Sequence, residues 1–283
     1  MNSIIKMLEP TIILTKRAGN HSNRLIQNAH IEAWCLENQV RFYNNDFADM
    51  AKLYCIPSSN PSKFLKFIFW SVKQFTFKKI KHLEFHTEDD QNVSILSKHI
   101  YSENFIFVSG FYFRSEALVL KHHTDLKIKY TIKKKHLVDN PFITKINSQK
   151  NQKTIIGIHI RRGDYQQYKE GIYYYSNDDY LNWIYTLKRT FQKESEKPTL
   201  FILFSNEKVN IPSSEDIIIS SHEWYIDQHV MSLCDYLIGP PSTFTLWASY
   251  MGKVPLKHMY RADAKIELDH FQVSNITNSP DLG

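Results

Sequence analysis

Short apolar runs alternate with polar loops and amphipathic segments in the first part of this chain. The run from Thr11 to Thr15 is β-branched and apolar, which predicts a buried strand followed by a polar loop. From Asn23, a candidate N-cap, to Asn38, apolar and small residues recur at helical spacing. Residues 40–43 predict the next strand. This order begins a βαβ unit, so we expect parallel sheets covered by helices.

The middle of the chain has a weaker pattern. Residues 57–103 are mostly helical in pattern and basic, and residues 105–108 predict another strand. Residues 118–137 are rich in lysine, which indicates helix or exposed surface. Residues 147–152 are polar and lack large apolar side chains, as is typical of a linker. We therefore expect two domains, residues 1–150 and 151–283.

A second series of strands and helices follows this linker. The apolar runs predict strands at residues 154–160, 199–204, 217–219 and 236–238. The periodic segments between and after them predict helices at residues 178–193, 227–234 and 244–251. Asp178 and Asp179 open the first of these helices, so we interpret them as a helix start rather than as metal ligands. The alternation again predicts an α/β domain.

Composition narrows the class of protein. With 42% hydrophobic and 23% charged residues in 283, the chain resembles folded globular proteins and not disordered, collagenous or coiled-coil ones. Glycine is scarce, so Gly19, Gly163 and Gly239 are expected to meet backbone requirements. The net charge of +6 suits a polyanionic partner: nucleic acid, an anionic membrane surface or a nucleotide diphosphate.

Cysteine usage and the N-terminal residues bear on location. The chain has an odd number of cysteines, and the three are widely spaced: Cys35, Cys55 and Cys234. This pattern predicts neither a disulfide framework nor a zinc site. A reducing compartment fits them best. The apolar patch in residues 1–16 is too short for a signal peptide or for a membrane span of about 20 residues. We expect a cytoplasmic protein whose membrane contact is at most peripheral, on the inner face.

The strongest candidate for chemistry is the segment GIHIRRGDY, residues 157–165. A buried strand here delivers His159, Arg161, Arg162 and Asp164 at its carboxyl end, the edge where open α/β sheets bind ligands. Adjacent guanidinium groups match phosphate oxygens, so a diphosphate would neutralise them. The alternatives are that His159 is a core histidine and that Arg162 forms a salt bridge with Asp164.

A second candidate covers residues 227–247. Ser242 and Thr243 follow a strand and open a helix, where backbone N–H groups and the helix dipole favour phosphate. Ser242 is alternatively only an N-cap. The carboxylate of Asp227 suits the N1–H and N2–H₂ donors of guanine, and the alternative is an aspartate on a helix surface.

Both segments resemble signatures of the α1,2-fucosyltransferases of glycosyltransferase family 11, in a bacterial or viral type without a membrane anchor. The loop at residues 19–27 resembles the family's N-terminal loop, and Pro240-Pro241 replaces its usual Ala-Asn. Residues 204–207, Phe-Ser-Asn-Glu, stand where many members have Phe-Ser-Asp-Asp. The resemblance implies a GT-B-like α/β fold of two Rossmann-like domains facing a cleft. Residues 1–150 would form the acceptor side and residues 151–283 the donor-binding domain.

The resemblance also implies a reaction and the residues that perform it. The enzyme would move L-fucose from GDP-β-L-fucose to a galactoside hydroxyl, with inversion at the anomeric carbon. The linkage it implies first is α1,2, on a surface glycan such as lipopolysaccharide or capsule. Arg161 would grip the β-phosphate, and Asp164 would act as general base or only hold the loop. The residues expected to contact the donor are His159, Arg161, Arg162, Asp227, Ser242, Thr243, Phe244, Asn20, Asn23 and Arg24.

Other functions stay open at this point. The donor could be another GDP-sugar. A basic nucleic-acid-binding protein is a third hypothesis, motivated by Lys133 to Lys135, but no reader motif is present, so we expect no nucleic-acid partner. No Asp-x-Asp with a suitable strand context or ligand spacing of His and Cys is found, so we expect no metal cofactor.

Overall fold

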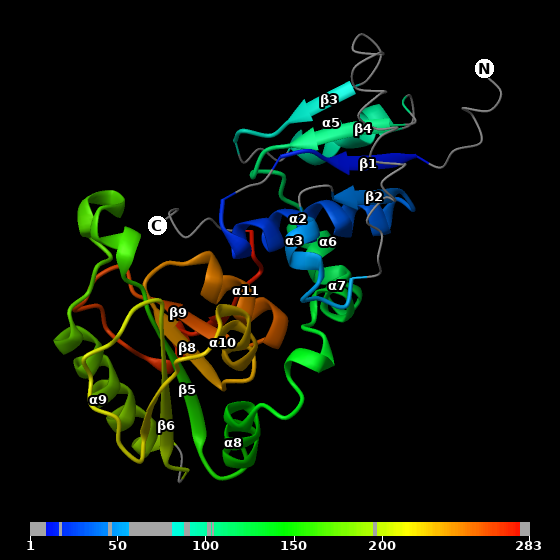
Figure 1. The fold of residues 1–283 in the computed structure, drawn as a ribbon. Coiled ribbons are helices and arrows are strands. Elements are labelled where there is room, and N and C mark those ends of the chain that lie inside the picture. Colours follow the sequence, from blue (N-terminus) through cyan, green and yellow to red (C-terminus); the bar gives the residue numbers. More distant parts are fainter. Residues whose placement is uncertain are drawn as a thin grey trace. The chain divides into compact units, whose positions relative to one another are not determined.

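The computed structural model describes residues 10–16, 19–44, 47–56, 81–87, 91–100, 103, 105–194 and 197–277. The chain divides into two compact units, Met1–Lys133 and Lys134–Gly283. Each unit contains one sheet with helices packed on it (Figure 1). No helix in the described part of the chain combines the length and the apolar character needed to cross a membrane.

The first unit contains a four-stranded parallel sheet in the order β2-β1-β4-β3. Its strands are β1 (Thr11–Leu14), β2 (Arg41–Asn44), β3 (Lys81–Glu84) and β4 (Phe105–Ser109). The predicted βαβ unit is confirmed, because β1 pairs in parallel with β2 across helix α2 (His21–Glu37). Strand β3 lies within the stretch that the pattern predicted as mostly helical. Only Leu83 of β3 is buried, so no apolar run marks this edge strand. Residues 57–80 lie outside the described residues.

The other helices of the first unit are α3 (Ala48–Ala51), α5 (Gln91–Ile100), α6 (Glu116–Lys121) and α7 (His123–Tyr130). Helices α2 and α5 share one hydrophobic core with β1 and β4. The N-cap of α2 is Asn20 and not Asn23, since the backbone N–H of Arg24 donates to the carbonyl of Asn20 at 3.1 Å. The helix therefore begins earlier than its apolar periodicity indicated.

The second unit contains a six-stranded sheet in the order β10-β9-β8-β5-β6-β7. Its strands are β5 (Thr154–Ile160), β6 (Thr199–Ser205), β7 (Ile217–Ile219), β8 (Tyr236–Gly239), β9 (Pro255–His258) and β10 (Gln272–Val273). All pairs are parallel except β9 with β10. The chain runs outward from β5 through β6 to β7, and then from β8 through β9 to β10 on the other side. This is the Rossmann order, with its topological switch point between β5 and β8.

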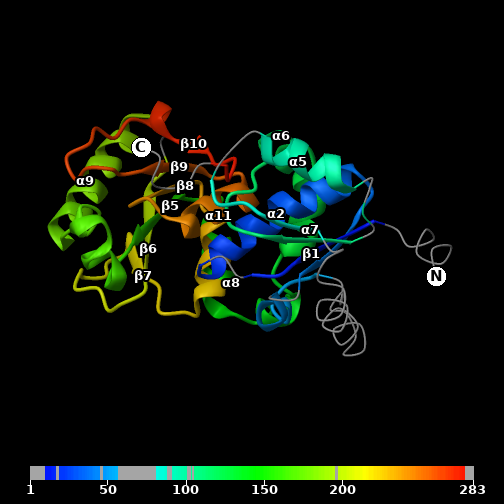
Figure 2. The same ribbon diagram turned by 90° about the horizontal axis from the view of Figure 1, so that it is seen from above.

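Helices cover both faces of this second sheet. Helix α9 (Asn177–Glu194) lies on one face, and α10 (Trp224–Met231) and α11 (Thr243–Gly252) lie on the other (Figure 1, Figure 2). The predicted helix start before α9 is confirmed. Ser176 and Asp179 form a capping box, in which Ser176 N donates to Asp179 Oδ2 at 2.8 Å and Asp179 N donates to Ser176 Oγ at 3.1 Å.

Half of the segment expected to link two domains, residues 147–149, is helical. Helix α8 (Pro141–Gln149) is capped by the side chain of Asn140 and buries Phe142, Ile143 and Ile146. The two units divide between Lys133 and Lys134, so α8 belongs to the second unit. The expected boundary was later in the chain, after residue 150. The polar composition of residues 147–152 reflects the exposed end of α8 and the turn that leads into β5.

Candidate functional site

The ends of β5 and β8 meet at the switch point of the second unit. The two strands pair in parallel as far as Ile158 and Ile238, and the chain then leaves each strand in a loop. Gly239 lies directly against His159, because a Cβ on Gly239 would be 2.6 Å from the carbonyl oxygen of His159. A side chain at this position would push the two strand ends apart. The loops after β5 and β8 are therefore close together where open sheets bind ligands.

Arg161 leaves the end of β5 and pairs with Asp164. Its Nη2 atom lies 2.8 Å from Asp164 Oδ1 and 3.1 Å from Oδ2. Gly163, with φ of +64°, supplies the left-handed turn between them. The Arg161 side chain is 24% exposed and that of Asp164 61%. The alternative in which Asp164 pairs with Arg162 is thus wrong, and the two candidate catalytic residues contact each other.

Arg162 has a different environment from Arg161. Its guanidinium donates to the carbonyl of Tyr175 at 2.5 Å and to Asn177 Oδ1 at 2.6 Å. The guanidinium also lies over the ring of Tyr174, 4.9 Å from its centroid. Its backbone N–H donates to Asn206 Oδ1 at 3.0 Å. Asn206 belongs to the Phe-Ser-Asn-Glu segment, for which the sequence predicted no role. Arg162 therefore holds the loop after β5. We expected both guanidinium groups to bind one anion, but in the structure each has its own partners within the protein.

The N-terminus of α11 follows the end of β8. Ser242 is its N-cap and accepts the N–H of Phe244 at 3.2 Å, so the N-cap interpretation is confirmed. Thr243 and Thr245 lie in the first turn, where backbone N–H groups have no partner inside the helix. The hydroxyl of Thr245 donates to the Ser242 carbonyl at 2.9 Å and lies 2.9 Å from Nε2 of His258. A capped helix end is thus fixed beside the switch point.

His159 is buried at the switch point, 5% exposed, with its ring 5.4 Å from that of Phe244. Burial, with smaller contributions from Arg161 and His258, lowers the pKa of His159 to about 3, so the imidazole is neutral. Its Nδ1 atom is buried without a hydrogen-bond partner among the described residues. Burying a polar atom without a hydrogen-bond partner costs about 1–3 kcal/mol of folding free energy. A histidine whose ring nitrogens are hydrogen-bonded in an ordinary core does not carry this cost. The atom therefore marks a place where a ligand can pair with it.

Asp227 lies in α10, near the carboxyl end of β7. It is 6% exposed, and its Oδ1 accepts the hydroxyl of Ser220, which directly follows β7, at 2.5 Å. Burial raises the pKa of Asp227 to about 7, while the Ser220 hydrogen bond acts in the opposite direction. The interpretation as a surface aspartate is wrong. A buried carboxylate with one serine donor suits a ligand that supplies further N–H groups.

Tyr165 is a part of this site that sequence reasoning missed. Its hydroxyl donates to the carbonyl of Pro241 at 2.5 Å, and its ring lies beneath Arg161. The residue stands inside the RRGDY motif, but nothing in the sequence indicates a partner so far along the chain. His258, at the end of β9, was missed for the same reason.

Comparison with protein families agrees with this geometry. The model described as glycosyl transferase family 11 matches residues 66–257, more than half of the chain. The chain belongs to glycosyltransferase family 11. No curated protein matches this glycosyltransferase by sequence.

Solved structures show its fold. A GDP complex of a variant of Arabidopsis thaliana FUT1 has a TM-score of 0.52 and 13% identity, over 94% of this chain and 73% of that one. The α1,6-fucosyltransferase NodZ soaked with GDP-fucose has a TM-score of 0.52 and 12% identity, over 89% and 95%. NodZ from Bradyrhizobium has a TM-score of 0.51 and 11% identity, over 93% and 97%. The expected GT-B-like α/β fold is thus confirmed for this glycosyltransferase.

Asn20, Asn23 and Arg24 lie in the first unit of the glycosyltransferase, at the N-terminus of α2. The guanidinium of Arg24 forms two hydrogen bonds with Asp49, at 2.7 and 3.1 Å, and its side chain is 7% exposed. Its charge is therefore paired with a carboxylate of the same unit, and the contact with fucose or phosphate expected for it stays a prediction. Asn20 is exposed, and Oδ1 of Asn23 has no hydrogen-bond partner among the described residues. These two asparagines keep their predicted role as donor contacts.

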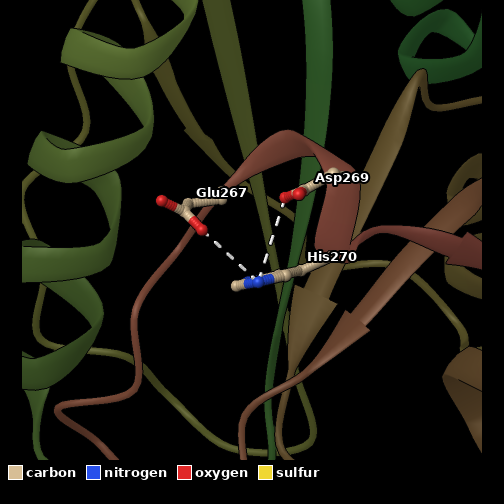
Figure 3. A group of neighbouring side chains, drawn as sticks. All are labelled: Glu267, Asp269 and His270. Carbon is tan, nitrogen blue, oxygen red and sulfur yellow. Dashed lines mark ion pairs between the residues drawn. The ribbon is translucent and has the colours of Figure 1, made fainter.

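One group of potential metal ligands lies elsewhere in the second unit, in the loop between β9 and β10. The ligand atoms of Glu267, Asp269 and His270 lie within 4.8 Å of one another (Figure 3). Lys265 forms an ion pair with Glu267, and Nζ of Lys257 is 3.1 Å from Nδ1 of His270. Two lysines thus already supply positive charge here, so we interpret this group as a surface charge network.

Proposed function

We propose that this glycosyltransferase moves L-fucose from GDP-β-L-fucose to a glycan hydroxyl, with inversion at the anomeric carbon. One observation carries the proposal. The switch point between β5 and β8 brings together the guanidinium of Arg161, the N-terminus of α11 and the buried Nδ1 of His159, which has no hydrogen-bond partner among the described residues. A cation, helix N–H groups and a buried polar atom at one sheet edge suit the diphosphate of a nucleotide sugar.

The proposed chemistry is a single displacement. The acceptor oxygen bonds to the anomeric carbon as the bond to the β-phosphate oxygen breaks, so negative charge develops on the departing GDP. Arg161 and the first turn of α11 stabilise that charge, and no metal ion is needed for it. Asp164 is the candidate base for the acceptor proton, and its ion pair orients Arg161 before the donor binds.

Asp227 is proposed to recognise guanine. In its ionised form it can accept the N1–H and N2–H₂ groups of the base, and Ser220 orients the carboxylate. Uracil and adenine lack this pair of donors on one edge, so the contact would select guanine nucleotides. Two of the solved structures with similar folds were studied with GDP or GDP-fucose, which supports the same donor.

A panel of donors tests the nucleotide and the sugar together. Saturating GDP or GDP-fucose is expected to raise the melting temperature, because ligands that bind only the native state stabilise it by mass action. UDP-galactose is expected to leave it unchanged. No shift with GDP would overturn the proposal. Transfer from labelled GDP-mannose in preference to GDP-fucose would favour the second candidate, another GDP-sugar, and DNA binding without GDP binding would favour the nucleic-acid hypothesis.

The acceptor is proposed to be a galactoside of a surface glycan, such as lipopolysaccharide or capsule, fucosylated in α1,2 linkage. Family membership and the RRGDY motif support this choice. The NodZ structure is of an α1,6-fucosyltransferase, so fold alone does not define the linkage. NMR of the product made from GDP-fucose and lactose will show which galactose oxygen carries fucose, and a 6-linked product would contradict the proposal.

We also propose peripheral contact with an anionic membrane, in keeping with the net charge of +6. Leu120 and Ile128 are 51% and 65% exposed on α6 and α7, beside Lys127 and beside Lys121, which pairs with Glu37. Aliphatic side chains among lysines suit an anionic lipid surface. We expect the protein to sediment with vesicles containing phosphatidylglycerol and not with phosphatidylcholine vesicles at low salt. Equal sedimentation with both, or with neither, would contradict this contact.

A further inference from the structure

Tyr165 connects the two loops that form the proposed diphosphate site. It lies in the short helix η3 (Gly163–Gln166), directly after the arginine motif, and is 9% exposed. Its hydroxyl donates to the carbonyl of Pro241 at 2.5 Å. Pro241 immediately precedes Ser242, the N-cap of α11. One buried side chain from the loop after β5 therefore holds the residue that precedes the N-cap of α11.

The ring of the same tyrosine supports Arg161. The guanidinium carbon of Arg161 lies 5.1 Å from the centroid of the Tyr165 ring, within the range of a cation–π contact. On that loop the ring also packs against Tyr168, with centroids 5.2 Å apart and planes inclined by 32°. Arg161 is thus held by the carboxylate of Asp164 and by an aromatic ring that is itself fixed by packing.

The loop after β8 has special need of such an anchor. Pro240 and Pro241 have no backbone N–H, so these two positions can be held to their surroundings only through their carbonyl groups and rings. The Tyr165 hydroxyl provides one such bond. The carbonyl of Gly239, just before the prolines, accepts the N–H of Met259 from the end of β9 at 2.8 Å. Tyr165 is therefore the link from this loop to the arginine side of the site.

We propose that Tyr165 is a positioning residue that sets the place of Arg161 relative to the N-terminus of α11, and so couples the two halves of the diphosphate site. The inference rests on the proposed function of that site. Developing charge on a leaving phosphate is stabilised only by groups already in place, so the coupling acts on the chemical step more than on donor binding.

The first test replaces Tyr165 by phenylalanine, which removes the hydroxyl and keeps the ring. We expect kcat to fall about tenfold, while KM for the donor changes less than kcat does. The matched control is Tyr175→Phe, because the Tyr175 hydroxyl also makes a buried hydrogen bond to a backbone carbonyl, that of Met259 at 2.7 Å. Equal losses of kcat and equal losses of melting temperature in the two variants would show a merely structural role and overturn the inference.

The second test is a double-mutant cycle with Arg161→Ala. If Tyr165 acts through Arg161, adding Tyr165→Phe to Arg161→Ala lowers kcat little further. Fully additive losses overturn the coupling. The cycle is measured with the GDP-sugar that the wild-type enzyme turns over fastest. If the donor sugar is not fucose, the cycle is run with another GDP-sugar and the inference is still tested. If the losses of kcat are additive, the inference about Tyr165 fails and the proposed function of the site does not.

Discussion

Replacement of Arg161 by alanine is expected to lower kcat for fucosyl transfer by about 10²–10³-fold, equivalent to about 2.7–4 kcal/mol of transition-state stabilisation. The reason is that Arg161 is the cationic side chain at the switch point whose partner, Asp164, is exposed and readily replaced by a phosphate. Steady-state kinetics with GDP-fucose measure the effect. KM should rise less than kcat falls, because the charge on the leaving phosphate grows in the transition state.

The control for this variant is Arg261→Ala. Arg261 lies in the same unit and pairs with Asp263 at 2.7 Å, so its removal also deletes an arginine–aspartate ion pair, one whose arginine is more exposed than Arg161. In both pairs the carboxylate is exposed to solvent, which limits the contribution of the pair to stability, so both variants should fold and melt close to the wild-type temperature. The Arg261 variant should keep wild-type turnover. Full activity of Arg161→Ala, or an equal loss in both variants, would remove Arg161 from the mechanism.

Affinity for GDP-fucose is expected to fall about tenfold between about pH 8 and about pH 6, because the ionised form of Asp227 binds guanine. Its pKa is raised to about 7 by burial, so the carboxyl takes up a proton across this range. The pKa values of His159 and His258, about 3 and about 4, keep both imidazoles neutral throughout. GDP-fucose is the right probe, because its diphosphate is esterified at both ends and lacks the phosphate ionisation near pH 6 that free GDP has.

The same raised pKa has the opposite consequence for the protein without nucleotide. A carboxyl whose pKa is raised in the native state contributes stability in its protonated form. This contribution is fully present at pH values below the pKa of the unfolded state, about 3.9. That stability is lost as pH rises through about 7. Nucleotide binding and the free energy of unfolding should thus respond to pH in opposite directions between about pH 6 and about pH 8. Calorimetric binding and denaturant titration at each pH measure the two.

Replacement of Asp227 by asparagine is expected to abolish this pH dependence and to weaken GDP-fucose binding by about 10–100-fold, the value of a charge-assisted hydrogen bond. The matched control is Asp216→Asn. Asp216 also accepts a serine hydroxyl, that of Ser214 at 2.6 Å, but its pKa is lowered by the contact with Lys188. That variant should keep the pH dependence. An unchanged pH profile in Asp227→Asn would show that guanine is recognised elsewhere.

The central strands of the second unit could be predicted from sequence because they are buried on both faces. Strands β5 and β6 are continuous apolar runs, which have few other interpretations in an α/β chain. The edge strands β3 and β10 could not be predicted in this way, since most of their residues are at least partly exposed. The start of α9 could be predicted, because a capping box is made of residues close together in the chain.

The amino-acid sequence by itself determined the α/β class, the family and the positions of the two motifs, because these depend on local pattern and on residues near one another. Only the tertiary structure decided which side chains meet. It paired Arg161 with Asp164, turned Arg162 to Tyr175 and Asn177, and joined Tyr165 to Pro241 across 76 positions. The direction of a side chain at a strand end is set by packing and by competing hydrogen-bond acceptors, and distant parts of the chain supply most of them.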